Sequence, residues 1–286
     1  MGSLRFTKGH GTENDFVLVP DPDGSLALTP DRVRALTDRR AGIGGDGVIR
    51  VVPTRLADDP DVRALAPDAG WFMDYRNADG SLAEMCGNGA RVFAAYLRRE
   101  GLESADQFGI ATRSGLRRVR RTADGYAVDL GPWTVVDAPA ARGAGFTAVV
   151  QSRGGRELPA LRLDVGNPHA IVVLPPDLDL GELDLSAPPH VAPTPEHGVN
   201  VEYVRVEGPG HIAVRVHERG VGETRSCGTG AAAAALATRW WEGEAADNRT
   251  WVVDVPGGRL AVTATLAGTV VLAGPAVLVA DGTTAL

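Results

Sequence analysis

The two cysteines of the chain are the residues whose surroundings most directly suggest chemistry. Cys86 and Cys227 each stand immediately before a Gly-x-Gly turn, and each turn opens an apolar segment that is closed by a glycine, Gly101 or Gly243. This pattern predicts two helices, each with a thiol at its N-terminus. A helix N-terminus carries unpaired backbone N–H groups and a partial positive charge, so it binds carboxylates and stabilises a thiolate.

Two such thiols on opposite sides of a bound amino acid would make a racemase. One thiolate would remove the α-proton, and the other thiol would deliver a proton to the opposite face. The backbone N–H groups would stabilise the negative charge that moves onto the carboxylate. Lowering a cysteine pKa from about 8.5 to about 7 takes roughly 2 kcal/mol. One helix end supplies about 0.3–1 kcal/mol, or up to ~2 when it is partly buried.

The sequence argues against cofactor chemistry. Pyridoxal phosphate needs a lysine for its Schiff base, and the only lysine, Lys8, lies in a strand-like run before Gly9 and Gly11. No Cys/His cluster has metal-ligand spacing. No strand is followed by a dinucleotide fingerprint or a phosphate loop. We therefore expect no cofactor and no metal.

Composition limits the partners and the location. The chain has 286 residues and a net charge of −7, enough for one large domain or two of about 140 residues. Its arginines form no basic stripe, which disfavours nucleic acid. No stretch approaches the roughly 18 to 20 apolar residues of a membrane span, and the N-terminus lacks the apolar region of a secretory signal. We expect a cytoplasmic protein with no membrane partner, whose cysteines are reduced.

Alternating hydrophobicity and turn residues predict many short strands besides the two cysteine helices. A further helix is expected from Pro30 to about Arg40, capped by Thr29. Residues 54–70 are expected to be a surface excursion, and the Pro/Ala/Gly-rich residues 138–145 to start a second unit. The expected strands are 4–8, 15–19, 48–52, 71–76, 107–112, 116–122, 126–130, 161–165, 171–174, 199–206, 212–218, 251–255, 260–266, 270–272 and 277–279.

The two halves of the chain share a pattern. Asn14 leads into an apolar strand as Asn167 does, and Asn77 stands nine residues before Cys86 as Glu218 does before Cys227. This spacing indicates a duplicated domain. We predict an α/β fold of the α+β type with two pseudo-symmetric domains, 1–131 plus 275–286 and 132–274. Each would be a curved, mostly antiparallel sheet around a central helix, with the helix N-termini facing a shared cleft.

Five motifs in order resemble those of the diaminopimelate epimerase family. They are residues 77–81, 86–91, 166–169, 198–201 and 218–230, and the resemblance extends from Asn14 to Ala276. It implies cofactor-independent interconversion of LL- and meso-diaminopimelate, a small-molecule substrate, for lysine and peptidoglycan synthesis. It also implies the two-domain fold described above. Related proline racemases and hydroxyproline epimerases typically carry histidine where this chain has Asn88, and phenazine-biosynthesis-type isomerases lack the thiol pair.

The resemblance assigns roles to individual residues. It implies that Cys86 and Cys227 are the acid/base pair and that His169 and Glu218 tune them. Independently, a guanidinium such as Arg219 suits a second carboxylate, and Glu218 suits an ammonium group. The residues implied to bind substrate, with backbone N–H groups at 87, 88, 228 and 229 holding the reacting carboxylate, are Asn14, Asn77, Gly87, Asn88, Asn167, Asn200, Glu218, Arg219, Gly228 and Thr229.

Three positions depart from the family pattern. Glu13 occupies a position that is usually glycine, so the sequence does not establish that the backbone beside Asn14 has the conformation typical of the family. Gly47 falls where many members carry a glutamine that contacts substrate. Ala280 falls where some members have a tyrosine at their dimer interface, so a homodimer is possible without that contact.

Two alternatives stand beside the epimerase hypothesis. One is another amino-acid racemase of the same fold, similar to proline racemase. The other is a thiol redox or binding protein, which would need a close-spaced cysteine pair or an exposed reactive cysteine. That second alternative leaves the motifs around Asn167, His169 and Glu218 without an explanation. Turn asparagines also often have purely structural roles.

Overall fold

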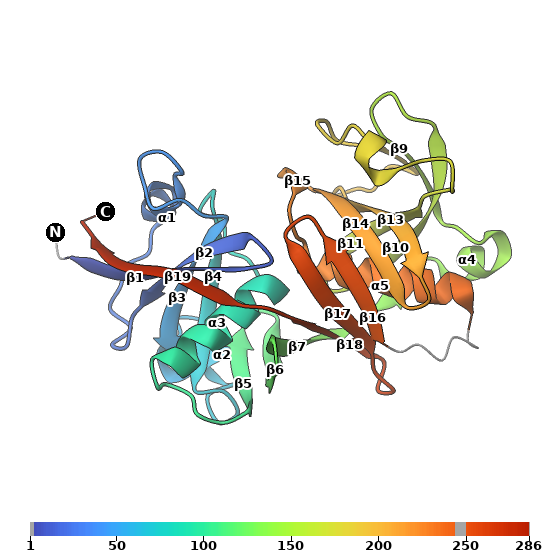
Figure 1. Ribbon diagram of the computed structural model, residues 1–286. Helices are drawn as coiled ribbons and strands as arrows, with labels where there is room; N and C mark the ends of the chain where they lie inside the picture. Colours follow the sequence, from blue (N-terminus) through green and yellow to red (C-terminus); the bar gives the residue numbers. More distant parts are fainter. Residues whose placement is uncertain (1–2, 244–249, 286) are drawn as a thin grey trace. The chain divides into compact units, whose positions relative to one another are not determined.

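The computed structural model describes residues 3–243 and 250–285 and divides into two compact units (Figure 1). Unit 1 comprises residues 1–129 and 273–286, and unit 2 comprises residues 130–272. Both are rich in strands and contain few helices. Among the described residues, no helix is long and apolar enough to cross a membrane.

The strands of unit 1 form a mixed sheet with antiparallel and parallel pairs. β19 pairs antiparallel with β1, β1 antiparallel with β2, β2 parallel with β3, β3 antiparallel with β4, and β4 parallel with β5. β5, β6 and β7 form the expected antiparallel meander. The strands are β1 (Leu4–Gly11), β2 (Asn14–Pro20), β3 (Gly47–Pro53), β4 (Trp71–Asn77), β5 (Gln107–Thr112), β6 (Gly115–Thr122), β7 (Gly125–Pro132) and β19 (Val277–Thr284).

Unit 2 repeats this order of pairings. β8 pairs antiparallel with β10, β10 antiparallel with β11, β11 parallel with β13, β13 antiparallel with β14, β14 parallel with β16, and β16 antiparallel with β17. The strands are β8 (Thr134–Val135), β10 (Glu157–Asp164), β11 (Pro168–Val173), β13 (Asn200–Gly208), β14 (His211–Glu218), β16 (Thr250–Val255), β17 (Gly258–Ala264) and β18 (Thr269–Gly274). The duplication inferred from the spacing therefore has a counterpart in the strand pairing.

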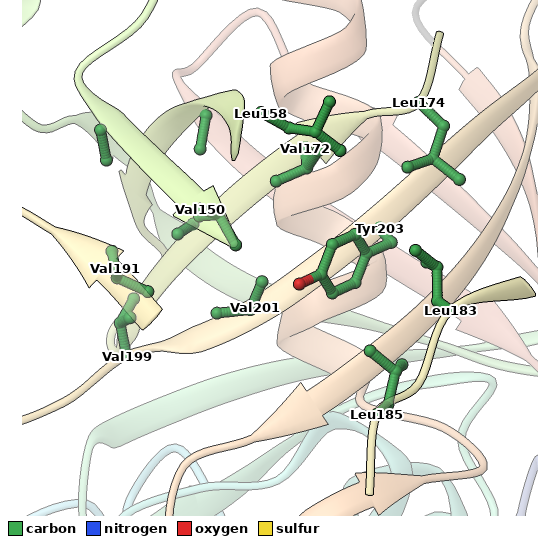
Figure 2. Packing of buried hydrophobic residues seen from close by; sticks show 13 residues of the cluster. Val150, Leu158, Val172, Leu174, Leu183, Leu185, Val191, Val199, Val201 and Tyr203 are labelled. Carbon is green, nitrogen blue, oxygen red and sulfur yellow. The ribbon is translucent and has the colours of Figure 1, made fainter. Parts of the chain in front are cut away.

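Four short strands of unit 2, β8 and three others, have no equivalent among the strands expected from the sequence. β9 (Ala148–Gln151) pairs with β10 and with β12 (His190–Ala192), and β15 (Gly222–Thr224) pairs with β14. Figure 2 shows the apolar cluster under this region, in which the Tyr203 ring lies among Val172, Val201 and Leu183. The cluster gives unit 2 a second apolar core on the side of the sheet that α5 does not cover.

Each cysteine helix is enclosed by the strands of its own unit (Figure 1). α3 (Gly87–Arg99) packs against β1, β2, β3, β4 and β19, and α5 (Gly228–Glu242) packs against β10, β11, β13, β14, β16 and β17. Their first three turns are almost entirely buried, as expected for helices that are apolar nearly all round. At Gly9 a Cβ would lie 2.8 Å from Val92 Cγ1, so this glycine lets β1 approach α3 closely.

Two segments of unit 1 differ from the expectation. α1 (Pro30–Thr37) ends before residue 40 because the Asp38 carboxylate accepts the N–H groups of Arg40 and Ala41, both at 2.7 Å. Residues 54–70 contain a 3-10 turn, η1 (Thr54–Leu56), and a short helix, α2 (Pro60–Arg63), rather than a simple excursion. This segment buries Ala57, Val62 and Ala69 in a small core.

The Pro/Ala/Gly-rich residues at the start of unit 2 also form a helix. α4 (Ala138–Ala144) is capped by Asp137, whose carboxylate accepts the Ala140 N–H at 3.3 Å. Gly145 ends it in the left-handed conformation, a common helix terminator. A second 3-10 turn, η2 (Leu180–Glu182), has a capping box between Asp179 and Glu182.

A buried cluster of ion pairs links strands of unit 1. The Arg50 side chain is 4% exposed and lies 2.7 Å from Asp21 Oδ2 and 3.4 Å from Asp74 Oδ2. Removing one partner of a buried pair leaves an uncompensated charge. We therefore expect Asp21→Ala to destabilise the protein by about 3 kcal/mol, measured by thermal denaturation. Asp177→Ala, which removes an exposed pair with Arg156, should leave the melting temperature nearly unchanged, and equal effects would contradict the expectation.

Candidate active site

Both cysteines occupy the N-cap positions of enclosed helices. Cys86 precedes α3 with an extended backbone (φ −142°, ψ 120°), and its sulfur accepts the Gly89 N–H at 3.4 Å. Cys227 precedes α5 with a similar backbone (φ −112°, ψ 116°). Both are thiols in the structure. The caps are most often Ser, Thr, Asp or Asn, so a cysteine here places a sulfur beside the positive end of each helix.

In unit 1, an asparagine is oriented toward the first thiol. The Cys86 Sγ lies 3.6 Å from Asn14 Oδ1, and the Asn88 amide donates to the same oxygen at 3.2 Å. The Asn14 amide donates in turn to Asp46 Oδ2 at 2.7 Å. Since the carboxylate accepts the amide protons, the carbonyl of Asn14 is fixed toward Cys86 and Asn88.

The turn before Asn14 has a left-handed backbone although Glu13 stands where the family usually has glycine. Thr12 and Glu13 have φ angles of 51° and 64°, in the left-handed region that glycine favours. The Glu13 N–H donates to His10 Nδ1 at 3.2 Å. The chain thus keeps the conformation expected of a glycine, at a cost on the order of 1 kcal/mol for each residue.

Gly47 leaves no room for a side chain. A Cβ there would lie 2.5 Å from both Arg76 O and Tyr75 Cε2. In the two parallel pairs, Phe16 lies opposite Gly47 and His169 lies opposite Asn200. Gly47 therefore takes in unit 1 the place that Asn200 takes in unit 2, and no side chain there can contact a substrate.

Asn77, at the end of β4, belongs to a separate turn of unit 1. Its amide donates to Ser81 Oγ at 3.0 Å, and its backbone N–H donates to Ser81 O at 3.0 Å. The side chain is half-buried. The structure therefore connects Asn14, Cys86 and Asn88 directly, whereas Asn77 bonds to Ser81.

In unit 2, a carboxyl group stands beside the second thiol. Cys227 Sγ lies 3.6 Å from Thr229 Oγ1. Burial raises the pKa of Glu218, while hydrogen bonds from Thr224 and from the Cys227 thiol lower it in part. Burial also raises the pKa of Cys227 well above its ordinary value, and the charges of Glu218 and Glu202 raise it further.

A buried histidine joins two other predicted residues of unit 2. His169 is fully buried, with Nδ1 2.7 Å from Glu202 Oε1 and Nε2 2.9 Å from Asn167 Oδ1. The contact with a carbonyl oxygen requires a proton on Nε2. The imidazole therefore holds the carbonyl oxygen of Asn167, and the NH2 group of the same side chain points away from His169.

The last two predicted residues of unit 2 form their own contact. Asn200 Oδ1 accepts the backbone N–H of Arg219 at 2.9 Å, and Arg219 Nη1 donates to His197 O at 2.8 Å. Gly198 has a φ of 72°, and a Cβ there would lie 2.9 Å from Arg219 Cδ. The glycine thus gives the arginine side chain space beside β13 and β14.

The sequence model of diaminopimelate epimerase matches residues 6–136 and 162–279. This chain belongs to the diaminopimelate epimerase family. Diaminopimelate epimerase of Streptomyces coelicolor is 50% identical over 285 residues, covering 98% of this chain and 94% of that protein. That of Thermobifida fusca is 48% identical over 284 residues, covering 98% and 97%.

Solved structures share the fold of this epimerase. A phenazine biosynthesis protein of the PhzF family from Bacillus anthracis superposes with a TM-score of 0.67 at 16% identity, covering all of both chains. A hydroxyproline epimerase from Agrobacterium vitis gives 0.64 at 14% identity, covering 99% of this chain and 91% of that one. The predicted family, the mixed α/β fold class and the assignment as an isomerase are confirmed.

Three residues of the epimerase that contact the predicted site were missed by the sequence analysis. Asp46 orients Asn14, Glu202 binds His169, and Arg91 lies in the first turns of α3. Signals for two of them were present: Glu202 interrupts an apolar strand, and Arg91 interrupts an apolar helix. Within residues 3–243 and 250–285, no cluster of three or more His, Cys, Asp or Glu side chains could hold a metal ion.

Proposed function

We propose that this epimerase interconverts LL- and meso-diaminopimelate by a two-base reaction of Cys86 and Cys227. The observation that carries the proposal is that each cysteine occupies the N-cap position of an enclosed helix, with polar side chains held beside it. Each unit would be one epimerase domain and would supply one thiol. The proposed domains are residues 1–131 plus 275–286 and residues 132–274. The role of every site residue is part of this proposal.

The reaction needs one thiol on each face of the reacting carbon. The thiolate takes the α-proton, and the partner thiol donates a proton to the other face, so the configuration inverts and one proton enters for each that leaves. Backbone N–H groups at Gly87 and Asn88, and at Gly228 and Thr229, would hold the carboxylate on which charge accumulates. Asn14, Asn77, Asn167, Asn200, Glu218 and Arg219 would hold the ammonium groups and the distal carboxylate.

The burial of the second thiol disfavours a redox role. Cys227 is 8% exposed, and burial together with two carboxylates raises its pKa. Redox-active cysteines are exposed and have lowered pKa values. Among amino-acid racemases, the buried Asn88 and its bond to Asn14 favour diaminopimelate over the proline-type substrates of relatives that typically carry histidine there.

The activity should show a bell-shaped dependence on pH. One thiol must be charged while its partner keeps its proton, so the pair titrates in two macroscopic steps. The raised pKa of Cys227 makes it the natural acid, and its ionisation should cause the falling limb at alkaline pH. Initial rates with LL-diaminopimelate across the pH range check this. A kcat/KM that still rises at about pH 10 without turning over would contradict it.

Substrate choice tests the proposed function directly. The purified enzyme, without added cofactor, should convert LL-diaminopimelate to the meso isomer and should leave L-proline and trans-4-hydroxy-L-proline unchanged, as resolved by chiral chromatography. Racemisation of either proline substrate with no action on diaminopimelate would overturn the proposal.

We also propose where the enzyme works and how it assembles. We place the enzyme in the cytoplasm, where its thiols stay reduced, and we propose a homodimer. Ala280 lies on β19, which presents Val277 and Val279 to solvent. Light scattering of the purified protein determines the mass in solution, and a monomer at micromolar concentration would contradict the dimer.

A further inference from the structure

Arg91 is a fully buried arginine that has no carboxylate partner. It lies on α3, five residues after Cys86, and is 0% exposed. Its hydrogen bonds all go to neutral oxygens: Gly87 O at 3.3 Å, Pro275 O at 3.2 Å and Thr12 Oγ1 at 3.4 Å. Within the described parts of the chain, no acidic side chain forms an ion pair with it.

A buried arginine is normally paired. Arg50, in the same unit and almost as buried, has Asp21 and Asp74 for partners. Gly11 lies close to the guanidinium, since a Cβ added there would be 2.9 Å from Arg91 Nη2. The guanidinium is therefore held in place with a charge that no described carboxylate compensates.

A charge on the first thiol acts on this guanidinium. Burial lowers the pKa of Arg91 to about 10, whereas the charge of Cys86 raises it. At neutral pH the guanidinium is still protonated. The interaction is reciprocal, so the charge of Arg91 favours the thiolate of Cys86 over the thiol. Asp46 is linked to Cys86 through Asn14 and is itself paired with Arg39 at 2.7 Å.

The second thiol has surroundings of opposite charge. Ala232 takes the place on α5 that Arg91 takes on α3. Glu218 of β14 and Glu202 of β13 both raise the pKa of Cys227. Glu202 is fully buried, its Oε2 has no hydrogen-bond partner among the described residues, and its Oε1 would lie 2.5 Å from a Cβ at Gly230 in the first turn of α5. Among the described contacts of Glu202, its Oε1 lies 2.7 Å from His169 Nδ1.

We propose that Arg91 is the buried counter-ion of the Cys86 thiolate and that, with Glu202 and Glu218 beside Cys227, it places the resting charge on Cys86 and the resting proton on Cys227. Arg91 is a positioning residue, since it acts through Cys86. The inference rests on the two-thiol reaction proposed above. After one turnover the proton taken by Cys86 and the proton given by Cys227 must be exchanged back before the resting form is restored.

Single-thiol enzymes separate the two titrations. Cys227→Ser leaves only Cys86, and Cys86→Ser leaves only Cys227, so the ultraviolet absorbance of the thiolate as a function of pH gives one midpoint for each. We expect the Cys86 midpoint to lie at least about one pH unit lower, which is a tenfold difference in the ratio of thiolate to thiol. Equal midpoints, or a lower midpoint for Cys227, would overturn the proposal.

Variants of Arg91 test the source of the difference. In the Cys227→Ser enzyme, Arg91→Gln keeps hydrogen bonding but removes the charge, and should raise the Cys86 midpoint by about one unit. Arg91→Lys keeps a charge and should restore most of the shift. The same changes in the Cys86→Ser enzyme serve as matched controls and should move the Cys227 midpoint much less. If neither variant moves the Cys86 midpoint although activity falls, Arg91 has only a structural role and the proposal is wrong.

A further variant keeps the test decisive if the Arg91 variants do not fold. Glu202→Gln in the Cys86→Ser enzyme removes a buried carboxylate and should lower the Cys227 midpoint, whereas a raised or unchanged midpoint would count against the charge assignment. These titrations are made without substrate. Failure of the enzyme to act on diaminopimelate is therefore distinguishable from failure of this inference.

Discussion

Replacement of either cysteine by alanine is expected to abolish epimerisation, with kcat falling at least about 10³-fold in each variant. The reason is that inversion needs a proton acceptor on one face of the α-carbon and a proton donor on the other. One thiol cannot fill both roles in one passage. Coupled or chiral assays of meso-diaminopimelate formation measure the loss.

The fold should survive both changes. The sulfur of Cys86 contacts Asn14 and Gly89, that of Cys227 contacts Thr229, and the loss of either sulfur leaves the helix N–H groups in place. Circular dichroism and melting temperature are the controls. Variants that fold normally and keep more than a few per cent of activity would show that the two-thiol reaction is wrong.

The second large effect is expected at Glu218. We expect Glu218→Gln to lower kcat on the order of 10²-fold, because the partly buried side chain beside Cys227 then loses the negative charge that keeps the proton on this thiol and that would pair with an ammonium group. The same variant should be more stable than the original enzyme at neutral pH. An activity loss combined with a higher melting temperature distinguishes a functional carboxyl from a structural one.

The sign of the stability change follows from the direction of the pKa shift. Burial raises the pKa of Glu218 in the folded state, so the folded state binds its proton more tightly than the unfolded state does. Stability therefore falls as the pH rises from the unfolded pKa through the folded pKa. Glutamine removes that penalty at neutral pH. Glu223→Gln, on the exposed carboxylate that pairs with Arg215 at 2.7 Å, is the matched control and should change neither kcat nor stability appreciably.

Local signals made the thiol helices and most strands predictable from the sequence. The cysteine before Gly-x-Gly marks the beginning of each helix, and the closing glycine marks its end. Both helices begin and end at the expected places. Turn glycines such as Gly115 and Gly125 marked the meander of unit 1. In each case a few adjacent residues determine the backbone, so distant parts of the chain are not needed for the prediction.

The parts that the sequence did not reveal depend on contacts between distant segments. The partners of His169 and Asn14 are Glu202 and Asp46, more than thirty residues away in the chain, and only the strand pairing brings them together. Arg91 could be noticed as a charge in an apolar helix, but its isolation from carboxylates is a property of the folded unit. Residues 54–70 were misread because their small apolar residues have no strong periodicity.

The fate of the α-hydrogen in heavy water tests the central claim most directly. The enzyme is incubated with LL-diaminopimelate in D2O, and substrate and product are separated at early times and analysed by mass spectrometry. Two thiols predict that each new meso product carries one deuterium at the inverted carbon, while recovered LL substrate is still unlabelled. Product that keeps the original hydrogen, or substrate that becomes labelled as fast as product, would show a single base and contradict the account.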